Sequence, residues 1–319
     1  MTTFIQNPTQ QLQLKKLTGR IGAEINGIHL SSELDSSTVQ FIYDALLEHK
    51  VLFFRGQQHL GDTEQEKFAE LFGSPVKHPT VPAVYGTDFI FELNSQKGVR
   101  ANSWHTDVTF VDAYPKISIL RGLIIPETGG DTTWANTETA YEDLPELLKQ
   151  FTDQLVAVHS NDYDYDYGGP KQNVEPEQLE RLKKIFVSTK YETEHPVVVV
   201  HPETGKKSLL LGHFFKRLVG FSQSDSQLLF NILQEKVTRP ENTVRWQWQE
   251  GDVVIWDNRS TQHYAVNDYG DQHRVVRRIT LAGEVTTGVH GLKGKTIIPK
   301  DLSAEQLEKA KLHAVLNAN

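Results

Sequence analysis

The feature that most constrains the fold is a series of short apolar runs that begins after residue 105 and continues almost to the end of the chain. The runs are rich in β-branched and other apolar residues and are bounded by turn-forming residues, which is typical of β-strands. Strands of this length and frequency, with few helices among them, predict a sandwich or a jelly roll. The predicted strands cover residues 117–125, 130–135, 155–160, 196–201, 208–211, 244–248, 252–256 and 274–283.

The first hundred residues mix strands with helices. Rough alternation of polar and apolar residues around three glycines predicts a strand pair at residues 12–17 and 20–30, and the continuous apolar run at 51–54 predicts a buried strand. No internal repeat and no linker divides the chain. We therefore expect a mixed α/β, mainly β protein that forms one domain over residues 1–319.

Apolar residues at helical spacing predict several helices among these strands. Ser36 or Ser37 is expected to cap the first helix, and Thr63 with Glu66 resembles a capping box that opens the second. Residues 161–173 are rich in Asp, Tyr and Gly without a usable period, so we expect a mobile lid loop there. The remaining predicted helices cover residues 137–151, 176–186, 224–238 and, at the C-terminal end, 304–316.

Composition excludes several classes of function. The formal net charge of −8 over 319 residues argues against a nucleic-acid or membrane-surface binder. Because the chain has no cysteine, disulfides, Fe–S clusters and thiolate zinc sites are excluded, and a bound metal must use imidazole and carboxylate ligands. The polar N-terminal stretch lacks a signal-peptide core, and no run approaches the length of a membrane span. We expect a cytoplasmic protein.

The strongest chemical signal is a His-x-Asp pair formed by His105 and Asp107. In an extended segment, side chains two residues apart leave the same face, so both can reach one point. The best third ligand is His263, which lies beyond a predicted strand and beside Tyr264. Two imidazoles and one carboxylate on one side of a metal are the ligand set of non-haem Fe(II) oxygenases.

A lone His-x-Asp pair is weak support, because a histidine on a strand often simply bonds a neighbouring carboxylate. The apolar residues around the pair favour a metal, since an unpaired polar cluster in dry surroundings is costly. Other pairs compete for the role, but they lack a convincing third partner, and we interpret them as strand-end residues. These pairs are His195 with His201 and His159 with Asp162.

Two arginines follow the third ligand at positions suited to an anion. Arg274 and Arg278 are four residues apart on a predicted strand and face one side, while Arg277 must point the other way. Guanidinium groups hold carboxylates and sulfates bidentately. Thr132, after a glycine turn, can add a hydroxyl donor to the same anion. The alternative is a basic edge strand that resists aggregation.

With these residues in hand, the sequence resembles the taurine dioxygenase family of Fe(II)- and 2-oxoglutarate-dependent oxygenases. The resemblance runs from about Thr18 to about Glu284 and depends on four separate motifs. They are TGRIGAEI at residues 18–25, WHTDVTF at 104–110, GGDTTWAN at 129–136, and WDNR through QHY at 256–264.

The resemblance implies a double-stranded β-helix (jelly roll) core with flanking helices. It implies His105, Asp107 and His263 as the Fe(II) ligands, and Thr132 with Arg274 on the distal carboxylate of 2-oxoglutarate. Arg278 would then lie beside this cosubstrate and bind the anionic group of the substrate. O2 would take the remaining position on the iron, and a homo-oligomer is expected.

Within the family, the sequence is most similar to the alkylsulfatase branch. The segments that carry this similarity are RANSWH at residues 100–105, HPTVP at 78–82 and YETEHP at 191–196. The similarity implies that His78 contacts the sulfate group and that Val108 lines the substrate channel. Ala101 stands where the taurine enzymes carry an Asn that holds taurine, and an apolar residue there suits an alkyl tail better.

The expected activity is oxidative cleavage of alkyl sulfate esters to an aldehyde and inorganic sulfate, with succinate and CO2 formed from 2-oxoglutarate. One alternative is a dioxygenase of taurine or another sulfonate, which would release sulfite. Alternatives of other classes are a zinc hydrolase, because two His and one carboxylate also suit catalytic zinc, and a non-catalytic metal-binding jelly roll.

Overall fold

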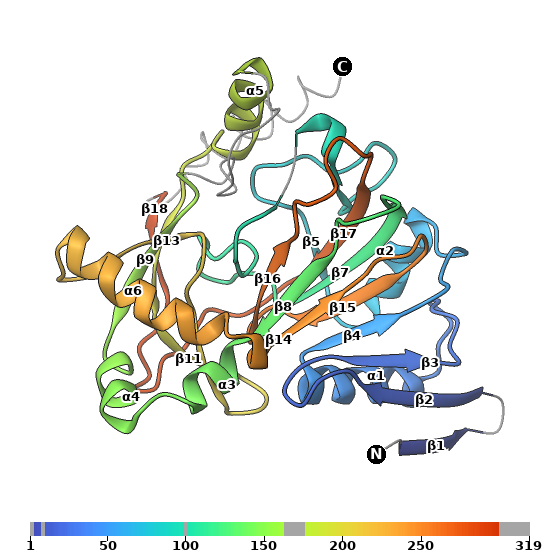
Figure 1. Cartoon of the computed structure of the whole chain (residues 1–319), viewed down its shortest axis with the longest axis horizontal. Coiled ribbons are helices and arrows are strands. Elements are labelled where there is room, and N and C mark those ends of the chain that lie inside the picture. Colours follow the sequence, from blue (N-terminus) through green and yellow to red (C-terminus); the bar gives the residue numbers. More distant parts are fainter. Residues whose placement is uncertain (1–2, 8–9, 99–100, 163–175, 300–319) are drawn as a thin grey trace.

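The structure is a computed structural model that describes residues 3–7, 10–98, 101–162 and 176–299. Within these ranges, nine strands form a large, mostly antiparallel sheet (Figure 1). Its order is β1-β2-β3-β4-β15-β7-β17-β5, and β6 also pairs with β17. The strands are β1 (Thr3–Asn7), β2 (Gln10–Lys16), β3 (Ala23–Asn26), β4 (Val51–Phe54), β5 (Pro75–Val76), β6 (Phe91–Asn94), β7 (Ile117–Ile124), β15 (Val253–Asp257) and β17 (Val275–Leu281).

A smaller sheet faces the large one. It has the order β14 (Thr243–Trp246), β8 (Thr132–Asn136), β16 (Thr261–Ala265). Apolar side chains of both sheets, among them Trp134 and Trp256, pack into one buried cluster between them. Two antiparallel sheets packed face to face over such a core confirm the expected jelly roll with a mainly β composition.

The rest of the described chain extends the molecule on the side of the smaller sheet, where Figure 1 shows α3, α4 and α6 gathered. The strands here form the four-stranded order β13-β9-β10-β18 and the pair β11-β12. Their bounds are β9 (Val156–Ser160), β10 (Glu192–Pro196), β11 (Val198–Val200), β12 (Lys207–Leu209), β13 (Phe215–Leu218) and β18 (Lys295–Ile298). The helices are α3 (Thr137–Glu142), α4 (Glu146–Thr152), α5 (Pro176–Phe186) and α6 (Gln223–Val237).

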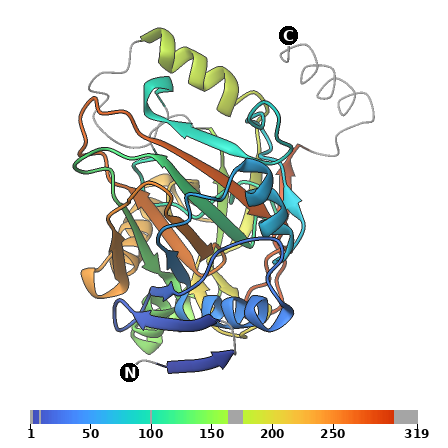
Figure 2. The same cartoon turned by 90° about the vertical axis from the view of Figure 1, so that its right-hand side faces the viewer.

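Helices α1 (Ser36–His49) and α2 (Asp62–Glu70) cover the outer face of the large sheet (Figure 2). Both exist as predicted, but their N-termini differ from the prediction. The cap of α1 is Asp35, whose side chain accepts from the backbone N–H of Thr38 at 2.9 Å. The N-cap of α2 is Gly61, which has no side chain to cap the helix. Glu66 does not form the expected capping box, because it accepts the backbone N–H groups of Asp88 and Phe89.

Several other predictions are confirmed or corrected. The strand pair β2-β3, strand β4, helix α5 and helix α6 lie where the sequence predicted them. The helix predicted at 137–151 is two helices, since Pro145 disfavours helical backbone at the residue before it. Strand β17 lies inside the large sheet between β7 and β5, so the alternative of a basic edge strand is wrong. The predicted lid at 161–173 falls almost wholly, and the helix at 304–316 wholly, outside the described residues.

A buried ion pair joins the end of α1 to α3. Lys50 follows α1 with a positive φ of 68° and is 1% exposed, and its ammonium lies 2.9 Å from the carboxylate of Glu138 on α3. Glu138 is equally buried, so neither charge can be solvated if its partner is lost. This pair fixes the end of α1 against the segment that follows β8.

We expect Glu138→Ala to destabilise the protein by about 3–5 kcal/mol, because it leaves the Lys50 ammonium buried and unpaired. Denaturant unfolding followed by circular dichroism measures the loss. The matched control is Glu48→Ala, which breaks the exposed pair between Lys16 and Glu48 and should cost no more than about 1 kcal/mol. Equal losses from the two variants would contradict the assigned role of the buried pair.

Candidate metal centre and anion site

The structure brings His105 and His263 together through their backbones. The N–H of His105 donates to the carbonyl of His263 at 3.0 Å, and the reverse bond is 2.8 Å. His263 lies on β16, a strand that the sequence analysis missed because its residues are mostly polar. Asp107 does not continue an extended strand as predicted, since a turn begins at this residue, yet its carboxylate reaches the same point.

The three side chains converge on one point with ligand atoms facing one another. Oδ1 of Asp107 lies 3.7 Å from Nε2 of His105 and 3.7 Å from Nε2 of His263. All three residues are at least 95% buried. Nδ1 of His105 lies 2.7 Å from the carbonyl of Ser103, which can only accept, so Nδ1 carries the proton and Nε2 presents its lone pair.

Protonation also favours a metal at this point. Burial lowers the pKa of His105 and holds the pKa of His263 well below its usual value, so both rings are neutral at neutral pH. Burial by itself would raise the pKa of Asp107, but the Arg278 guanidinium and the hydrogen bond from Ser118 keep it lowered. Neutral imidazoles and an ionised carboxylate are the forms that bind metals. The donor set, its burial and its lack of thiolates fit a ferrous ion.

Two residues orient Asp107 and were missed as functional residues by the sequence analysis. The hydroxyl of Ser118 on β7 donates to Oδ2 of Asp107 at 2.8 Å. Asn258 accepts from the backbone N–H of Asp107 at 2.9 Å and donates to its carbonyl at 3.1 Å. The only signal for Asn258 was its place in the WDNR motif, and nothing in the sequence pointed to Ser118.

Arg278 on β17 reaches the same centre, where its guanidinium pairs with Oδ1 of Asp107. Its Nε is buried and bonds no described residue, so the guanidinium keeps a donor free for a further anion. Arg277 faces the opposite way, as predicted, and pairs with Asp62 and Glu92.

Arg274 is a buried cation that forms no ion pair with a described carboxylate, although the nearby Asp131 offsets part of the lowering of its pKa by burial. It is 6% exposed, and its donors reach only the carbonyl of Gly130 at 2.9 Å and the hydroxyl of Thr132 at 3.4 Å. The Thr132 hydroxyl also accepts from the indole of Trp248 at 2.9 Å, so its own proton stays available. A buried guanidinium without an ion pair among the described residues, beside an available hydroxyl donor, is suited to an anion.

His78 lies near the metal point among aromatic rings, with its ring centroid 5.4 Å from that of Phe91 and 6.4 Å from that of Phe110. Its Nδ1 accepts the backbone N–H of Val81 at 3.1 Å, so Nε2 carries the proton. Burial, reinforced by Arg278, lowers the pKa of His78 to about 3. The ring is therefore a neutral hydrogen-bond donor at working pH. Val108, 4% exposed, packs with Phe214 beside it.

The competing histidine pairs do not form metal sites. His201 bonds the carboxylate of Asp257 at 2.9 Å, and His195 bonds Thr109 and Thr286. His159 also bonds Thr109, whereas Asp162 pairs with lysines. All three histidines lie at or next to strand ends, as interpreted from the sequence.

A protein-family model and several named relatives match most of this chain. The family model described as "Taurine catabolism dioxygenase TauD, TfdA family" matches residues 13–280. An alkylsulfatase of Acinetobacter baylyi is 95% identical over 319 residues, which covers 100% of both chains. An alpha-ketoglutarate-dependent sulfate ester dioxygenase of Pseudomonas putida is 60% identical over 286 residues, covering 90% of this chain and 94% of its own.

Solved structures agree with these relatives. A taurine dioxygenase from Burkholderia xenovorans superposes with a TM-score of 0.75 at 37% identity, covering 90% of this chain and 96% of its own. The structure of AAD-2 in complex with Mn(II) and N-oxalylglycine gives a TM-score of 0.69 at 26% identity, covering 86% of this chain and 98% of its own.

No helix in the described ranges is long and apolar enough to cross a bilayer.

Proposed function

The chain belongs to the TauD/TfdA family of dioxygenases, and from this premise we propose that it cleaves alkyl sulfate esters oxidatively with Fe(II), 2-oxoglutarate and O2. His105, Asp107 and His263 would hold the iron. The observation that carries the proposal is a pair of buried arginines four residues apart. Arg278 pairs with the triad carboxylate of Asp107 and keeps a spare donor, and Arg274 lies beside Thr132 without an ion pair among the described residues. Two buried arginines at one site suit a reaction that binds two anions at once.

Arg274 and Thr132 would hold the distal carboxylate of 2-oxoglutarate. A carboxylate here offsets the cost of the buried guanidinium and accepts a hydrogen bond from the Thr132 hydroxyl. With one end fixed in this way, the register of the cosubstrate toward the triad is set. The AAD-2 structure, solved with Mn(II) and N-oxalylglycine, supports a metal and a carboxylate ligand on the same fold.

Arg278 and His78 would hold the sulfate group of the substrate, with Arg278 also adjacent to the cosubstrate. The guanidinium supplies a charged donor, and the neutral His78 ring supplies Nε2–H without adding a second charge. Val108, Phe110 and Phe214 form an apolar cluster beside this position and suit the alkyl chain. The names of the sulfate-cleaving relatives, at 95% and 60% identity, support a sulfate ester over other anions.

The reaction follows from where the sulfate is held. When bound, Fe(II) with 2-oxoglutarate and O2 supplies the oxidation that hydroxylates the carbon bearing the ester oxygen, with release of succinate and CO2. The C–O bond to sulfate then breaks as the new hydroxyl loses its proton, giving an aldehyde and inorganic sulfate. The task of the protein is to hold the anion so that this carbon faces the triad.

Product analysis separates this function from its alternatives. We expect protein reconstituted anaerobically with Fe(II) and 2-oxoglutarate, then given O2 and an alkyl sulfate, to form one sulfate per succinate. Taurine as substrate serves as the comparison, because a sulfonate dioxygenase would release sulfite from it. Turnover without O2 or 2-oxoglutarate would instead indicate a zinc hydrolase, and metal binding without any succinate would indicate a non-catalytic protein. A homo-oligomer and a cytoplasmic location stay predictions.

A further inference from the structure

The residue after the metal-ligand candidate Asp107 adopts a backbone conformation that valine rarely takes. Val108 has a φ of 60°, although β-branched side chains are strongly disfavoured there. It lies in the turn formed by residues 107–110, in which the N–H of Val111 donates to its carbonyl at 3.2 Å. Such a conformation persists only where the surroundings enforce it.

Side chains of β9 and β10 form hydrogen bonds to this turn directly after Val108. Nε2 of His195 lies 2.8 Å from the carbonyl of Thr109, and the hydroxyl of Thr193 donates to the carbonyl of Phe110 at 2.7 Å. Nδ1 of His159 lies 2.8 Å from the Thr109 hydroxyl. Thr193, His195 and His159 are each 0% exposed, so water cannot replace these bonds.

The hydrogen bonds of His195 show which of its ring nitrogens carries the proton. The Thr109 carbonyl only accepts, so Nε2 of His195 carries the proton and Nδ1 must accept. Thr286 supplies that bond from a hydroxyl 2.8 Å away. Burial lowers the pKa of His195 to about 4, so the ring stays neutral and keeps this one orientation.

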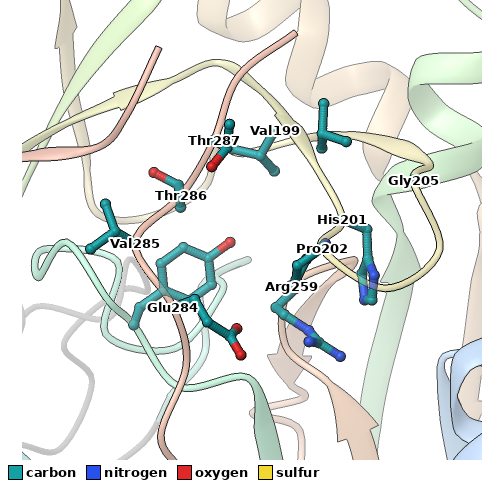
Figure 3. A pocket seen from close by; sticks show the side chains of 11 residues that line it. Val199, His201, Pro202, Gly205, Arg259, Glu284, Val285, Thr286 and Thr287 are labelled. Carbon is teal, nitrogen blue, oxygen red and sulfur yellow. The ribbon is translucent and has the colours of Figure 1, made fainter. Parts of the chain in front are cut away.

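Thr286 lies in the wall of a cavity of about 300 Å³, where Figure 3 shows it between Val285 and Thr287, facing the segment with Val199 and His201. The chain of bonds from this wall through His195 to Thr109 ends two residues from Asp107. The outer end of this series of hydrogen bonds, Thr286, therefore lines the cavity wall while being only 8% exposed itself.

We propose that His195 and Thr193 are positioning residues for the metal centre. They hold the 107–110 turn in its strained form, which aims the carboxylate of Asp107 at the two imidazoles and places Val108 against the substrate. This inference rests on the proposed metal site, but it concerns residues that contact neither metal nor substrate. Loss of these hydrogen bonds lets the turn relax, which weakens metal binding and misplaces the substrate carbon.

The first test compares His195→Leu with His195→Gln, measuring Co(II) binding by calorimetry and by the visible absorption of the bound ion. Residues that orient ligands indirectly typically change metal affinity about 10- to 100-fold, and we expect a loss of this size for His195→Leu. His195→Gln keeps an N–H that can donate to the Thr109 carbonyl and should restore most of the affinity and the wild-type spectrum. A role in stability alone would lower the unfolding temperature of both variants without this rescue.

Milder variants decide the matter if His195→Leu does not fold. Thr193→Val removes only the bond to Phe110 and should weaken Co(II) binding and raise the ratio of succinate to sulfate. Thr286→Val should act in the same direction, whereas Thr287→Val, in the same cavity wall but bonded to Lys293, should match the wild type. Wild-type affinity and product ratio in folded Thr193→Val and Thr286→Val would overturn the inference. A wild-type protein that binds no Co(II) would instead refute the metal site itself.

Discussion

Replacing His105 or Asp107 by alanine is expected to abolish sulfate and succinate formation and to lower metal affinity by more than about a hundredfold. Loss of an orienting partner alone typically costs about 10- to 100-fold, and a direct ligand must cost more. Asp107→Ala should be the more severe change, because its carboxylate also neutralises Arg278 and accepts from Ser118. Calorimetric titration with Fe(II) or Co(II) under anaerobic conditions and a succinate assay measure the two effects.

The control is His59→Ala, which removes an exposed imidazole that bonds the carbonyl of Leu30 rather than the triad. This variant should retain metal affinity and turnover. Full activity in folded His105→Ala or Asp107→Ala would show that the reaction does not depend on the three converging side chains. Because the readout includes metal binding, a loss of activity through misfolding is recognised by circular dichroism of the same samples.

That His105, Asp107 and His263 lie together could be predicted from the sequence, because the prediction depends on residue type and short spacing. A His-x-Asp pair must lie close in space wherever it falls, and His263 was chosen as the third candidate from its own segment, which follows the WDNR motif. What joined them could not be predicted: the backbone pairing of His105 with His263 links residues far apart in the chain. The short strand β16 was missed because its residues are mostly polar although three of the five are buried.

The residues that hydrogen-bond to the 107–110 turn were the hardest to predict from the sequence. Ser118 looks like any residue of a buried apolar strand, and its role appears only when β7 lies next to the 107–110 turn. His195 and His159 were interpreted as strand-end residues, which is where they lie, yet their bonds to Thr109 give them a further role. Sequence spacing does not encode which strands meet such a turn, since that depends on pairing across the whole fold.

Arg278→Ala is expected to raise the alkyl sulfate concentration needed for half-maximal rate far more than removal of one methylene from the substrate. Truncating one partner of a buried charge pair costs about 2–5 kcal/mol, which is roughly 30-fold or more in affinity. A buried methylene contributes only about 0.8 kcal/mol, or about fourfold. Steady-state kinetics with alkyl sulfates that differ by single carbons, on both proteins, give the comparison.

The matched control for this variant is Arg277→Ala, one residue earlier on the same strand. Its side chain faces Asp62 and Glu92 on the far side of the sheet, so it should leave the substrate requirement unchanged. Because Arg278 also pairs with Asp107, the metal affinity and the substrate-free decarboxylation of 2-oxoglutarate must be measured on the Arg278 variant. If both survive while the alkyl sulfate requirement rises, the arginine acts on the sulfate. Equal losses from Arg278→Ala and from one fewer methylene would instead mean that the alkyl chain, not the anion, directs binding.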